Sequence, residues 1–347
     1  MQAFDSHIRI ADDVIGQGQR VYIVAEMSAN HGQDFERAVD IVHAAKEAGA
    51  DAVKLQTYRP DTLTLNARNS NFYIKQGPWK GQYLYDLYTS AMTPWEWHAD
   101  LKSLADKIGM TLFSAPFDCS AVDLLEELNF PAYKIASPEL IDHELIRYTA
   151  QTTKPIIIST GSGTKKEIDD AVGIVSQERN SQLCLLKCTS EYPAPFSSMN
   201  LRTIEYMRDN WHCPIGLSDH SMGDSVAVAS VALGACLIEK HFMLDKSTKT
   251  ADSFFSLDKD EFSRLVKSVR EVEAALGNVH FPESINTARR ALYAVEDIEA
   301  GQTISVHNVK NLRPGNGEHP LQLSAVLGKR SLRTIKRGEA ISDQVVE

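Results

Sequence analysis

Polar side chains at the ends of apolar segments are the residues of this sequence that could do chemistry. Glu26 closes one such segment, Glu239 and His241 lie at the end of another, and His220 follows a third. Two imidazoles with nearby carboxylates suit a divalent cation such as Mn²⁺, Mg²⁺ or Co²⁺, which acts as a Lewis acid on a carbonyl group. The pattern therefore favours a metal beside an electrophile, although a single histidine in such a position is more often a structural residue.

Lysine and hydroxyl side chains occupy comparable positions. Lys54 and Gln56 are two residues apart, so they share one face of a strand. Other segment ends hold further polar residues: Lys134, Ser137, Glu139, Ser159, Ser190, Tyr192 and Ser218. Ammonium and hydroxyl donors suit a phosphate or carboxylate, although a lone lysine there usually forms a salt bridge and a serine often caps the next helix. Together these residues predict a site for an anionic substrate beside the metal.

The elements that must position these residues alternate along the chain. Short apolar segments predict strands at 21–25, 51–56, 110–114, 132–136, 155–159, 183–187, 214–218 and 236–240. Helical patterns lie between most of them. One opens with Thr164 and Glu167, which form a capping box, and another ends at Gly49, a stop signal. Eight such units predict an α/β fold, a parallel (β/α)8 TIM barrel with its active site at the C-terminal strand ends. An open doubly wound sheet usually has fewer strands.

Two regions depart from the barrel pattern. The segment from Arg59 to Trp97 is long, irregular and rich in aromatic residues, so it is either a functional lid or a surface excursion. The barrel domain is expected to span 1–276, followed by a linker at 277–287 and a small module at 288–347. Within that module the phrase "DIEAGQTIS" recurs as "TIKRGEAIS", which predicts pseudo-symmetry.

Composition excludes several classes of partner. The 347 residues carry a formal net charge of −10 without a basic cluster, which disfavours nucleic acid. No apolar run approaches the length of a signal peptide or a membrane span, so we expect a cytoplasmic protein that binds no membrane. The five cysteines lack metal-binding spacing and are expected to be reduced and mostly buried.

Several motifs, taken together, resemble the sialic acid synthase family over nearly the whole chain. They are "AEMSANHG", "AGADAVKLQTY", "AYKIASPE", "STGSG", "KCTSEYP", "GLSDHS", "EKHFMLDKS" and a C-terminal "LRPGNG". The resemblance implies a (β/α)8 barrel joined to a C-terminal antifreeze-like (SAF) domain. It also implies condensation of phosphoenolpyruvate with an N-acetylated hexose, which gives a nine-carbon 2-keto acid and phosphate.

The details of these motifs resemble one branch of the family most closely. "EMSANH", "TPWEWH", "MNL" and "KHFMLDKS" are most similar to the pseudaminic acid synthases. Their sugar substrate is 2,4-diacetamido-2,4,6-trideoxy-L-altrose. The alternative within the family is an N-acetylneuraminate or legionaminate synthase, which uses N-acetylmannosamine or a related acetamido sugar.

The resemblance also implies a role for each motif residue. His220 and His241 would bind the metal, with Mn²⁺ expected first, and Glu26 would be the acid/base group. Phosphoenolpyruvate would bind to Lys54, Lys134, Ser137, Ser159, Ser190 and Ser218. The sugar would bind to Gln56, Glu139, Tyr192 and Asp252, together with Arg313 from the partner subunit of a domain-swapped homodimer. Two residues, Ser190 and Ala115, depart from the family's sialic acid members, which carry Asn and Thr there.

Two readings from other classes remain open at this stage. Lys54, Lys134 and Lys187 all lie near predicted strand ends, so a Schiff-base aldolase is conceivable. A non-enzymatic protein would use the C-terminal module to bind ice or carbohydrate, with the barrel as a scaffold. The dense set of polar strand ends argues against a scaffold, because buried lysines and histidines would only destabilise it.

Overall fold

The computed structural model describes residues 4–282 and 288–347. The chain divides into two compact units, Met1–Gly277 and Asn278–Glu347. No helix within the described residues has the length and apolar character needed to cross a bilayer. The five cysteines are free, and four of them are buried.

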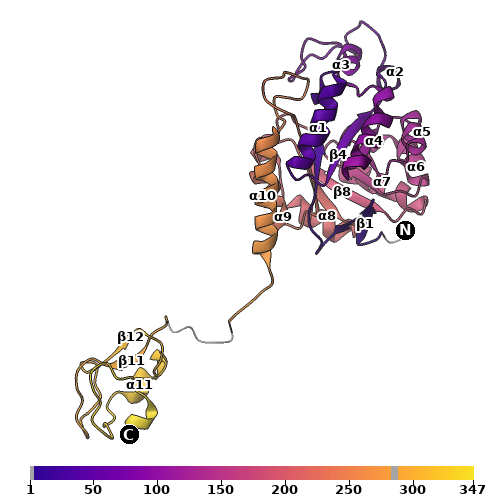
Figure 1. Cartoon of the computed structure of the whole chain (residues 1–347). Coiled ribbons are helices and arrows are strands. Elements are labelled where there is room, and N and C mark those ends of the chain that lie inside the picture. The colour runs from indigo at the N-terminus through magenta and orange to yellow at the C-terminus, as the bar shows by residue number, and fades with distance from the viewer. Residues whose placement is uncertain (1–3, 283–287) are drawn as a thin grey trace. The chain divides into compact units, whose positions relative to one another are not determined.

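The first unit is a closed barrel of eight parallel strands, in the order β10–β3–β4–β5–β6–β7–β8–β9 (Figure 1). This arrangement confirms the predicted (β/α)8 fold. Each strand lies within two residues of its predicted bounds, which is the usual uncertainty of strand ends. The strands are β3 (Tyr22–Glu26), β4 (Ala52–Thr57), β5 (Thr111–Pro116), β6 (Tyr133–Ile135), β7 (Ile156–Ser159), β8 (Leu183–Cys188), β9 (Ile215–Asp219) and β10 (Leu237–His241).

Amphipathic helices surround the barrel and begin where the capping signals predict. The Thr164 hydroxyl accepts the Glu167 N–H, and the Glu167 carboxylate accepts the Thr164 N–H at 2.7 Å. Gly49 adopts a φ of 88°, which suits a residue without a Cβ just after a helix. The helices are α1 (Phe35–Glu47), α4 (His98–Ile108), α5 (Cys119–Glu127), α6 (His143–Gln151), α7 (Lys165–Gln177), α8 (Thr203–Trp211), α9 (Ser225–Ala232) and α10 (Lys259–Leu276).

An N-terminal hairpin packs into the barrel interior. Its strands are β1 (His7–Ile10) and β2 (Asp13–Gly16), which pair antiparallel. Three isoleucines of the hairpin are buried in one cluster with the inward side chains of the barrel strands: Ile8, Ile10 and Ile15. Figure 1 shows this hairpin at the end of the barrel opposite α2 and α3. One end is therefore sealed by apolar packing, which leaves the C-terminal strand ends for the site.

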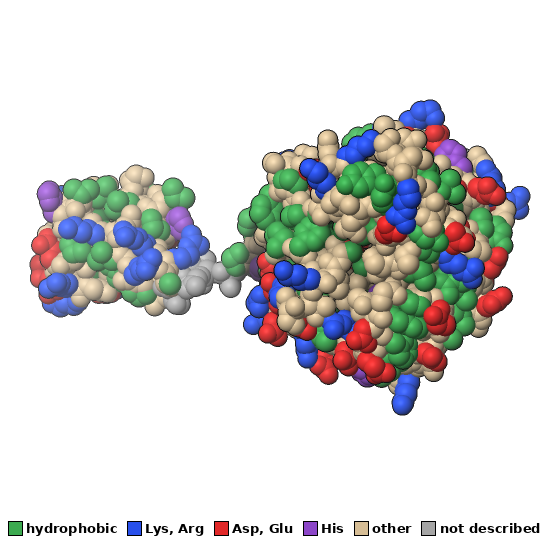
Figure 2. Space-filling view, turned by 90° about the horizontal axis from the view of Figure 1, so that it is seen from above, with side chains coloured by type: hydrophobic (Ala, Val, Ile, Leu, Met, Phe, Trp, Pro, Cys, Tyr) green, Lys and Arg blue, Asp and Glu red, His purple; other side chains and the backbone are tan. Residues whose placement is uncertain are grey.

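The irregular segment after β4 lies at that open end. It contains α2 (Pro60–Leu63), α3 (Leu84–Ala91) and the 3-10 turn η2 (Trp95–Trp97). Further 3-10 turns follow other strands: η1 (Ser28–His31), η3 (Ser137–Ile141) and η4 (Phe196–Ser198). Figure 2, which views the molecule from this side, shows hydrophobic and uncharged groups over much of the barrel's face and most acidic side chains toward its edge.

The second unit has its own small core and the expected pseudo-symmetry. Strands β11 (Ala291–Ala294) and β12 (Val309–Leu312) pair antiparallel, and η5 (Pro320–Gln322), α11 (Leu323–Val326) and η6 (Asp343–Val345) follow. The two copies of the repeated phrase face each other, because Ile298 and Ile335 exchange backbone hydrogen bonds at 2.8 Å in both directions. Each copy also buries its second isoleucine in the shared core: Ile304 and Ile341.

Candidate active site

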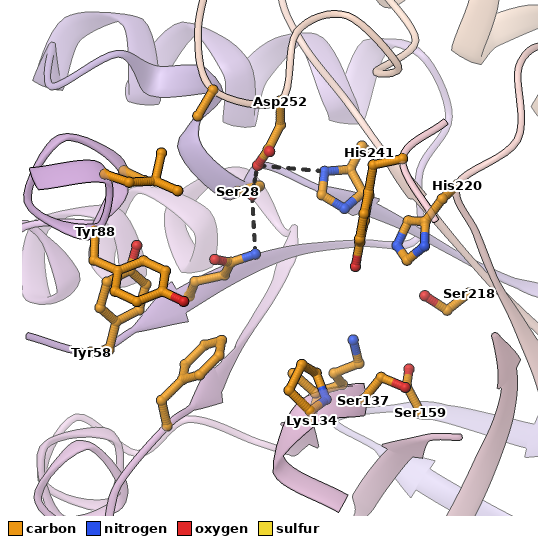
Figure 3. Close-up of a pocket in the computed structure, with 18 of the residues that line it drawn as sticks. Ser28, Tyr58, Tyr88, Lys134, Ser137, Ser159, Ser218, His220, His241 and Asp252 are labelled. Atoms are coloured by element: carbon orange, nitrogen blue, oxygen red, sulfur yellow. Dashed lines mark hydrogen bonds and ion pairs between the residues drawn. The ribbon is translucent and has the colours of Figure 1, made fainter. Parts of the chain in front are cut away.

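A cavity of about 390 Å³ opens at the C-terminal ends of the barrel strands (Figure 3). Residues from all eight strands or the loops that follow them line it, as the barrel geometry predicts. Ten of the predicted site residues line it: Lys54, Gln56, Lys134, Ser137, Ser159, Tyr192, Ser218, His220, His241 and Asp252. Ten of the fourteen predicted site residues therefore lie in one pocket.

Four predicted residues lie outside the lining. Glu26 is fully buried directly behind it, where its carboxylate contacts Lys54 and Gln56. Glu139 is half-buried in η3, and the Ser190 hydroxyl accepts a hydrogen bond from Ser162 at 3.0 Å. Arg313 is exposed in the second unit, whose position relative to the barrel is not determined.

Two lysines and two glutamates form a buried ionic network at the base of the cavity. Lys54 Nζ lies 2.9 Å from Glu26 Oε2 and 2.9 Å from Glu239 Oε2. Lys134 Nζ lies 3.0 Å from Glu239 Oε1, which also accepts a hydrogen bond from Ser218 at 3.1 Å. The two positive and two negative charges balance. Glu239 joins both lysines, a role that sequence reasoning missed although it noted the residue beside His241.

The network shifts the pKa values of its members in opposite directions. Burial raises the pKa of Glu26 to about 7; Lys54 opposes this shift and Glu239 adds to it. Burial acts on Glu239 in the same sense, but the adjacent Lys134 and Lys54 outweigh it and hold its pKa well below the usual range. Within one network, therefore, Glu239 stays ionised while Glu26 is poised to exchange a proton near neutral pH.

A chain of hydrogen bonds extends from this network to the loop after β10. Gln56 Nε2 donates to Glu26 Oε1 at 3.1 Å and to the Ser28 hydroxyl at 3.0 Å. Ser28 in turn donates to the Asp252 carboxylate, which lies 4.0 Å from His241 Nδ1 (Figure 3). Asp252 and Gln56 are thus held in place on one side of the pocket. Ser28 was missed as a site residue because its partner is 224 residues away.

The segment from Arg59 to Trp97 builds an apolar wall of the pocket. Leu84, Leu87, Tyr88 and Ala91 are spaced along one face of α3, and all line the cavity. The same wall includes Tyr58, Ile74, Trp79 and Phe117. Figure 3 shows Tyr58 and Tyr88 across the pocket from Ser218 and Ser159. The sequence left two alternatives for this segment, a functional lid or a surface excursion. Because its side chains line the cavity, the geometry supports a lid.

Trp79 connects this lid to the loops that follow β8 and β10. Its indole N–H donates to the Ala251 carbonyl at 2.9 Å, and its ring centroid lies 5.5 Å from that of Tyr192. Phe254 packs on the same indole. The lid therefore rests on two other loops that line the cavity.

Comparison with known proteins identifies the family. The NeuB family model matches residues 41–281. The chain belongs to the NeuB family. A SAF domain model matches residues 289–347, which agrees with the predicted antifreeze-like module. The family assignment also confirms the enzyme class expected from the motifs, and it leaves no support for the non-enzymatic reading.

Individual relatives place the chain within the NeuB family. It is 45% identical to the pseudaminic acid synthase of Campylobacter jejuni, over 93% of this chain and 96% of that protein. It is 33% identical to the N,N'-diacetyllegionaminic acid synthase of Legionella pneumophila, over 96% of both chains. The solved structure of an N-acetylneuraminic acid synthetase from Leptospira borgpetersenii superposes with a TM-score of 0.73 at 27% identity, covering 82% of this chain and 94% of that one.

Two imidazoles in this NeuB-family site could hold a metal. The rings of His220 and His241 have centroids 5.4 Å apart. The Thr189 carbonyl lies 2.9 Å from His220 Nδ1, which leaves Nε2 as the nitrogen available to a cation. His241 Nδ1 is buried and has no hydrogen-bond partner among the described residues, and burial holds the pKa of this ring well below its ordinary value. The first observation fits a ligand that binds through Nε2, and the second fits a neutral imidazole at His241.

The protein supplies few other ligands to such an ion. Within residues 4–282 and 288–347, no group of three or more His, Cys, Asp or Glu side chains has metal-binding geometry. A divalent cation held by the two histidines would therefore complete its coordination with water and substrate oxygens, which is the arrangement that a Lewis acid requires.

The structure corrects the Schiff-base alternative at Lys187. Alternate residues of β8 face inward, and Cys184 and Leu186 belong to the interior cluster whereas Leu183 and Leu185 pack outside. Lys187 therefore points away from the barrel axis, and it is not among the residues that line the pocket. Lys54 and Lys134 do reach the pocket, and both are ion-paired. The paired carboxylates raise the pKa of Lys54, which disfavours the neutral amine that a Schiff base needs, whereas burial lowers the pKa of Lys134.

Proposed function

We propose that this NeuB-family enzyme is a pseudaminic acid synthase of the cytoplasm. It would condense phosphoenolpyruvate with 2,4-diacetamido-2,4,6-trideoxy-L-altrose to a nine-carbon 2-keto acid and inorganic phosphate. The observation that carries the assignment is the 45% identity to a pseudaminic acid synthase over 93% of the chain. The legionaminic acid synthase of Legionella pneumophila is more distant, at 33% identity, so legionaminate or N-acetylneuraminate synthesis is the weaker candidate.

The polar base of the pocket suits phosphoenolpyruvate. Lys54 and Lys134 present ammonium groups, and hydroxyls from neighbouring strand ends surround them: Ser137, Ser159 and Ser218. Such donors neutralise and orient a phosphate and a carboxylate. In the free enzyme Glu26 and Glu239 hold the lysines in place, so the site is ordered before an anion arrives. Ordering both reactants side by side supplies much of the rate enhancement in reactions of this kind.

The opposite side of the pocket suits a sugar with few hydroxyls. Gln56, Tyr192 and Asp252 offer hydrogen bonds, while α3 and Trp79 offer apolar surface. A 6-deoxy sugar with two acetamido groups presents three methyl groups to such a wall. N-acetylmannosamine would instead place its 6-hydroxyl there, and a buried hydroxyl without a partner weakens binding. The lid therefore favours the deoxy sugar.

The chemistry requires a proton acceptor near the new bonds. Carbon 3 of phosphoenolpyruvate attacks the aldehyde carbon of the sugar, which leaves positive charge at carbon 2. Water adds to carbon 2 and loses a proton, the aldehyde oxygen gains one, and C–O cleavage releases phosphate. Glu26, with a pKa of about 7, would accept the proton of the water. Lys54 and Gln56 fix the orientation of its carboxylate.

His220 and His241 would hold the divalent cation, with Mn²⁺ the first candidate. When bound, such an ion would polarise the aldehyde oxygen and make the carbon a better electrophile. The residues around it serve to keep the two rings in position: the Thr189 carbonyl accepts from His220, and Phe255 packs against His241 with ring centroids 4.5 Å apart.

The second unit would complete the site from a partner subunit. Arg313 lies in the turn "RPGNG" and is exposed, so its guanidinium is available to a ligand outside its own unit. We propose a domain-swapped homodimer in which Arg313 of one chain contacts the sugar in the barrel of the other. The linker between the two units includes residues 283–287, which lie outside the described part of the chain.

The experiment that tests the reaction is identification of both products. Purified protein with Mn²⁺, phosphoenolpyruvate and the diacetamido sugar should release one phosphate per nine-carbon keto acid, measured by mass spectrometry and a phosphate assay. Water labelled with ¹⁸O should deliver its label to carbon 2 and leave the released phosphate unlabelled, since the C–O bond breaks. Label in the phosphate would contradict the proposed step.

A further inference from the structure

Four lysine side chains are buried among the described residues, and three of them have a carboxylate partner. Lys54 pairs with Glu26 and Glu239, and Lys134 with Glu239. The third, Lys240, lies 2.7 Å from Asp219. The fourth, Lys187, is only 8% exposed, and no ion pair within the described residues includes it.

Lys187 is anchored by its own loop. Its Nζ donates to the Cys188 carbonyl at 2.6 Å and to the Thr189 hydroxyl at 3.0 Å. Both acceptors are neutral. They fix the position of the ammonium group, supply no carboxylate to compensate its charge, and leave one of its three donors free. The neighbouring Cys188 thiol, whose pKa is lowered to about 7, favours the charged form only in part. A buried charge without an opposite charge is strongly destabilising, so a group in this position requires an explanation.

Because the Lys187 side chain points away from the barrel axis, it lines a cavity other than the catalytic pocket. A second cavity, of about 310 Å³, lies between the β8 strand end, the start of α7 and helix α8. Cys188 lines both this cavity and the active site, so one strand residue separates the two. The second cavity is therefore beside the catalytic pocket but on the outer surface of the barrel wall.

The lining of the second cavity is rich in donors. It includes Lys187, Lys165, Asn200, Thr160, Thr203 and Tyr206, of which Thr160 already donates its hydroxyl to the Leu186 carbonyl at 3.0 Å. Among the described residues the Thr203 and Tyr206 hydroxyls make no hydrogen bond, so both are available. One carboxylate that contacts lining residues is Asp169, which is already bound by Lys165 at 2.7 Å and by the Trp211 indole at 2.9 Å.

We propose that this cavity is an accessory site for a phosphate-class oxyanion, inorganic phosphate or a small phosphate monoester, which pairs with the Lys187 ammonium. A tetrahedral oxyanion can accept from the free ammonium donor and from several hydroxyls at once, and a charge-assisted hydrogen bond is stronger than a neutral one. Burial lowers the pKa of Lys187, and an anion beside it would restore the charged form. The site does not depend on the reaction proposed above.

Thermal unfolding of the full chain in a phosphate-free buffer tests this site. Because the catalytic pocket is proposed to bind the phosphate of phosphoenolpyruvate, Lys134→Met serves as the background in which that contribution is reduced. In this background, inorganic phosphate should raise Tm in a saturable manner. Adding Lys187→Met should weaken the apparent phosphate affinity at least tenfold. Without phosphate, the same change should leave Tm equal or higher, because it removes an uncompensated buried charge.

Matched controls separate this site from general salt effects. Lys166→Met removes an exposed lysine from α7, the helix whose start borders the cavity, and should leave the phosphate response unchanged. Glycerol 3-phosphate in place of phosphate distinguishes a monoester from the free anion, and chloride at equal ionic strength should have no effect. If Lys187→Met responds to phosphate as its background does, the proposal is wrong and Lys187 is a neutral amine satisfied by its loop.

A second measurement tests the proposal even if the Lys187→Met variant fails to fold. The unaltered protein can be crystallised with arsenate, whose anomalous signal should lie in the cavity between α7 and α8, near Lys187 Nζ. Lys187→Arg keeps the charge and should retain that signal. Arsenate found in the catalytic pocket alone would overturn the proposal.

Discussion

Lys134 Nζ and Glu239 Oε1 lie 3.0 Å apart at the base of the pocket, and both side chains are buried. The other oxygen of the same carboxylate binds Lys54. One glutamate therefore sets the position of two cations. Its loss would leave two buried cations with one carboxylate between them.

We predict that Glu239→Gln lowers the free energy of unfolding by about 3 kcal/mol, because removal of one partner leaves buried charges uncompensated. Phosphoenolpyruvate should recover part of this loss, since an anion can replace the missing carboxylate. Denaturant unfolding with and without phosphoenolpyruvate measures both effects. Glu47→Gln, which breaks an exposed pair with Lys259, is the control and should not change the transition. A Glu239→Gln protein as stable as the parent would contradict the role of Glu239 in compensating the buried lysine charges.

The raised pKa of Glu26 predicts a pH dependence. Burial lifts this pKa from 4.5 to about 7, so the carboxylate that accepts a proton is scarce at pH 6 and abundant at pH 8. The value of kcat should therefore rise as the pH passes through about 7. Glu26→Gln should lower kcat by about 10²–10⁴-fold and should abolish this dependence of kcat on pH.

Glu139 provides the matched comparison for this pH profile. Burial also raises its pKa to about 7, but it lies outside the pocket lining. Glu139→Gln should retain the inflection of kcat near pH 7. If this substitution changes a kinetic constant, that constant should be the KM for the sugar. An inflection that disappears in Glu139→Gln and persists in Glu26→Gln would reverse the assignment of the base.

Metal binding can be measured without turnover. His220→Ala and His241→Ala should each weaken Mn²⁺ binding at least tenfold, as followed by electron paramagnetic resonance of the free ion, with little loss of stability. Both residues lie above the packed layers of the barrel. Chelation should abolish activity, and Mn²⁺, Co²⁺ or Mg²⁺ should restore it. His43→Ala, on the exposed face of α1, should bind as the parent does. Unchanged Mn²⁺ binding by both site variants would exclude them as ligands.

The trans role of Arg313 is tested by subunit exchange. Arg313→Ala and His220→Ala should each be nearly inactive as homodimers. If Arg313 acts across the dimer, mixing them creates one complete site from an intact barrel and a partner's arginine, so activity should return. A mixture that stays inactive after confirmed exchange would show that Arg313 acts within its own chain or not at all.

Strand and helix periodicity was enough to predict the barrel. Apolar segments of the right length at eight places fixed the order of the strands, and the parallel fold then required their polar ends to converge. This is why Ser137, Ser159 and Ser218 could be grouped although they are distant in sequence.

Contacts between distant segments could not be predicted in the same way. Barrel closure pairs β10 with β3, and only this pairing brings Glu239 close to Lys54. The hairpin that seals the barrel rests on two strands of four residues, too short for a periodic signal, and its isoleucines are explained only by the barrel they enter.

Lys187 was misplaced for a different reason. Its position near a strand end suggested the active site, but side chains alternate along a strand, and the inward residues of β8 are the even-numbered ones. Once the structure shows that Cys184 faces inward, alternation assigns Lys187 to the outer surface, but the uniformly apolar residues 183–186 do not set that phase in the sequence.

The choice of sugar can be measured as the ratio of the enzyme's kcat/KM values for two sugars. Phosphate release should be measured with phosphoenolpyruvate and Mn²⁺, using 2,4-diacetamido-2,4,6-trideoxy-L-altrose and N-acetylmannosamine under identical conditions. N-acetylmannosamine would bury its 6-hydroxyl without a hydrogen-bond partner and would leave part of the apolar wall without contact. We therefore predict that kcat/KM is at least about 10²-fold higher for the diacetamido sugar. Equal efficiency on N-acetylmannosamine would contradict the account and assign the enzyme to N-acetylneuraminate synthesis.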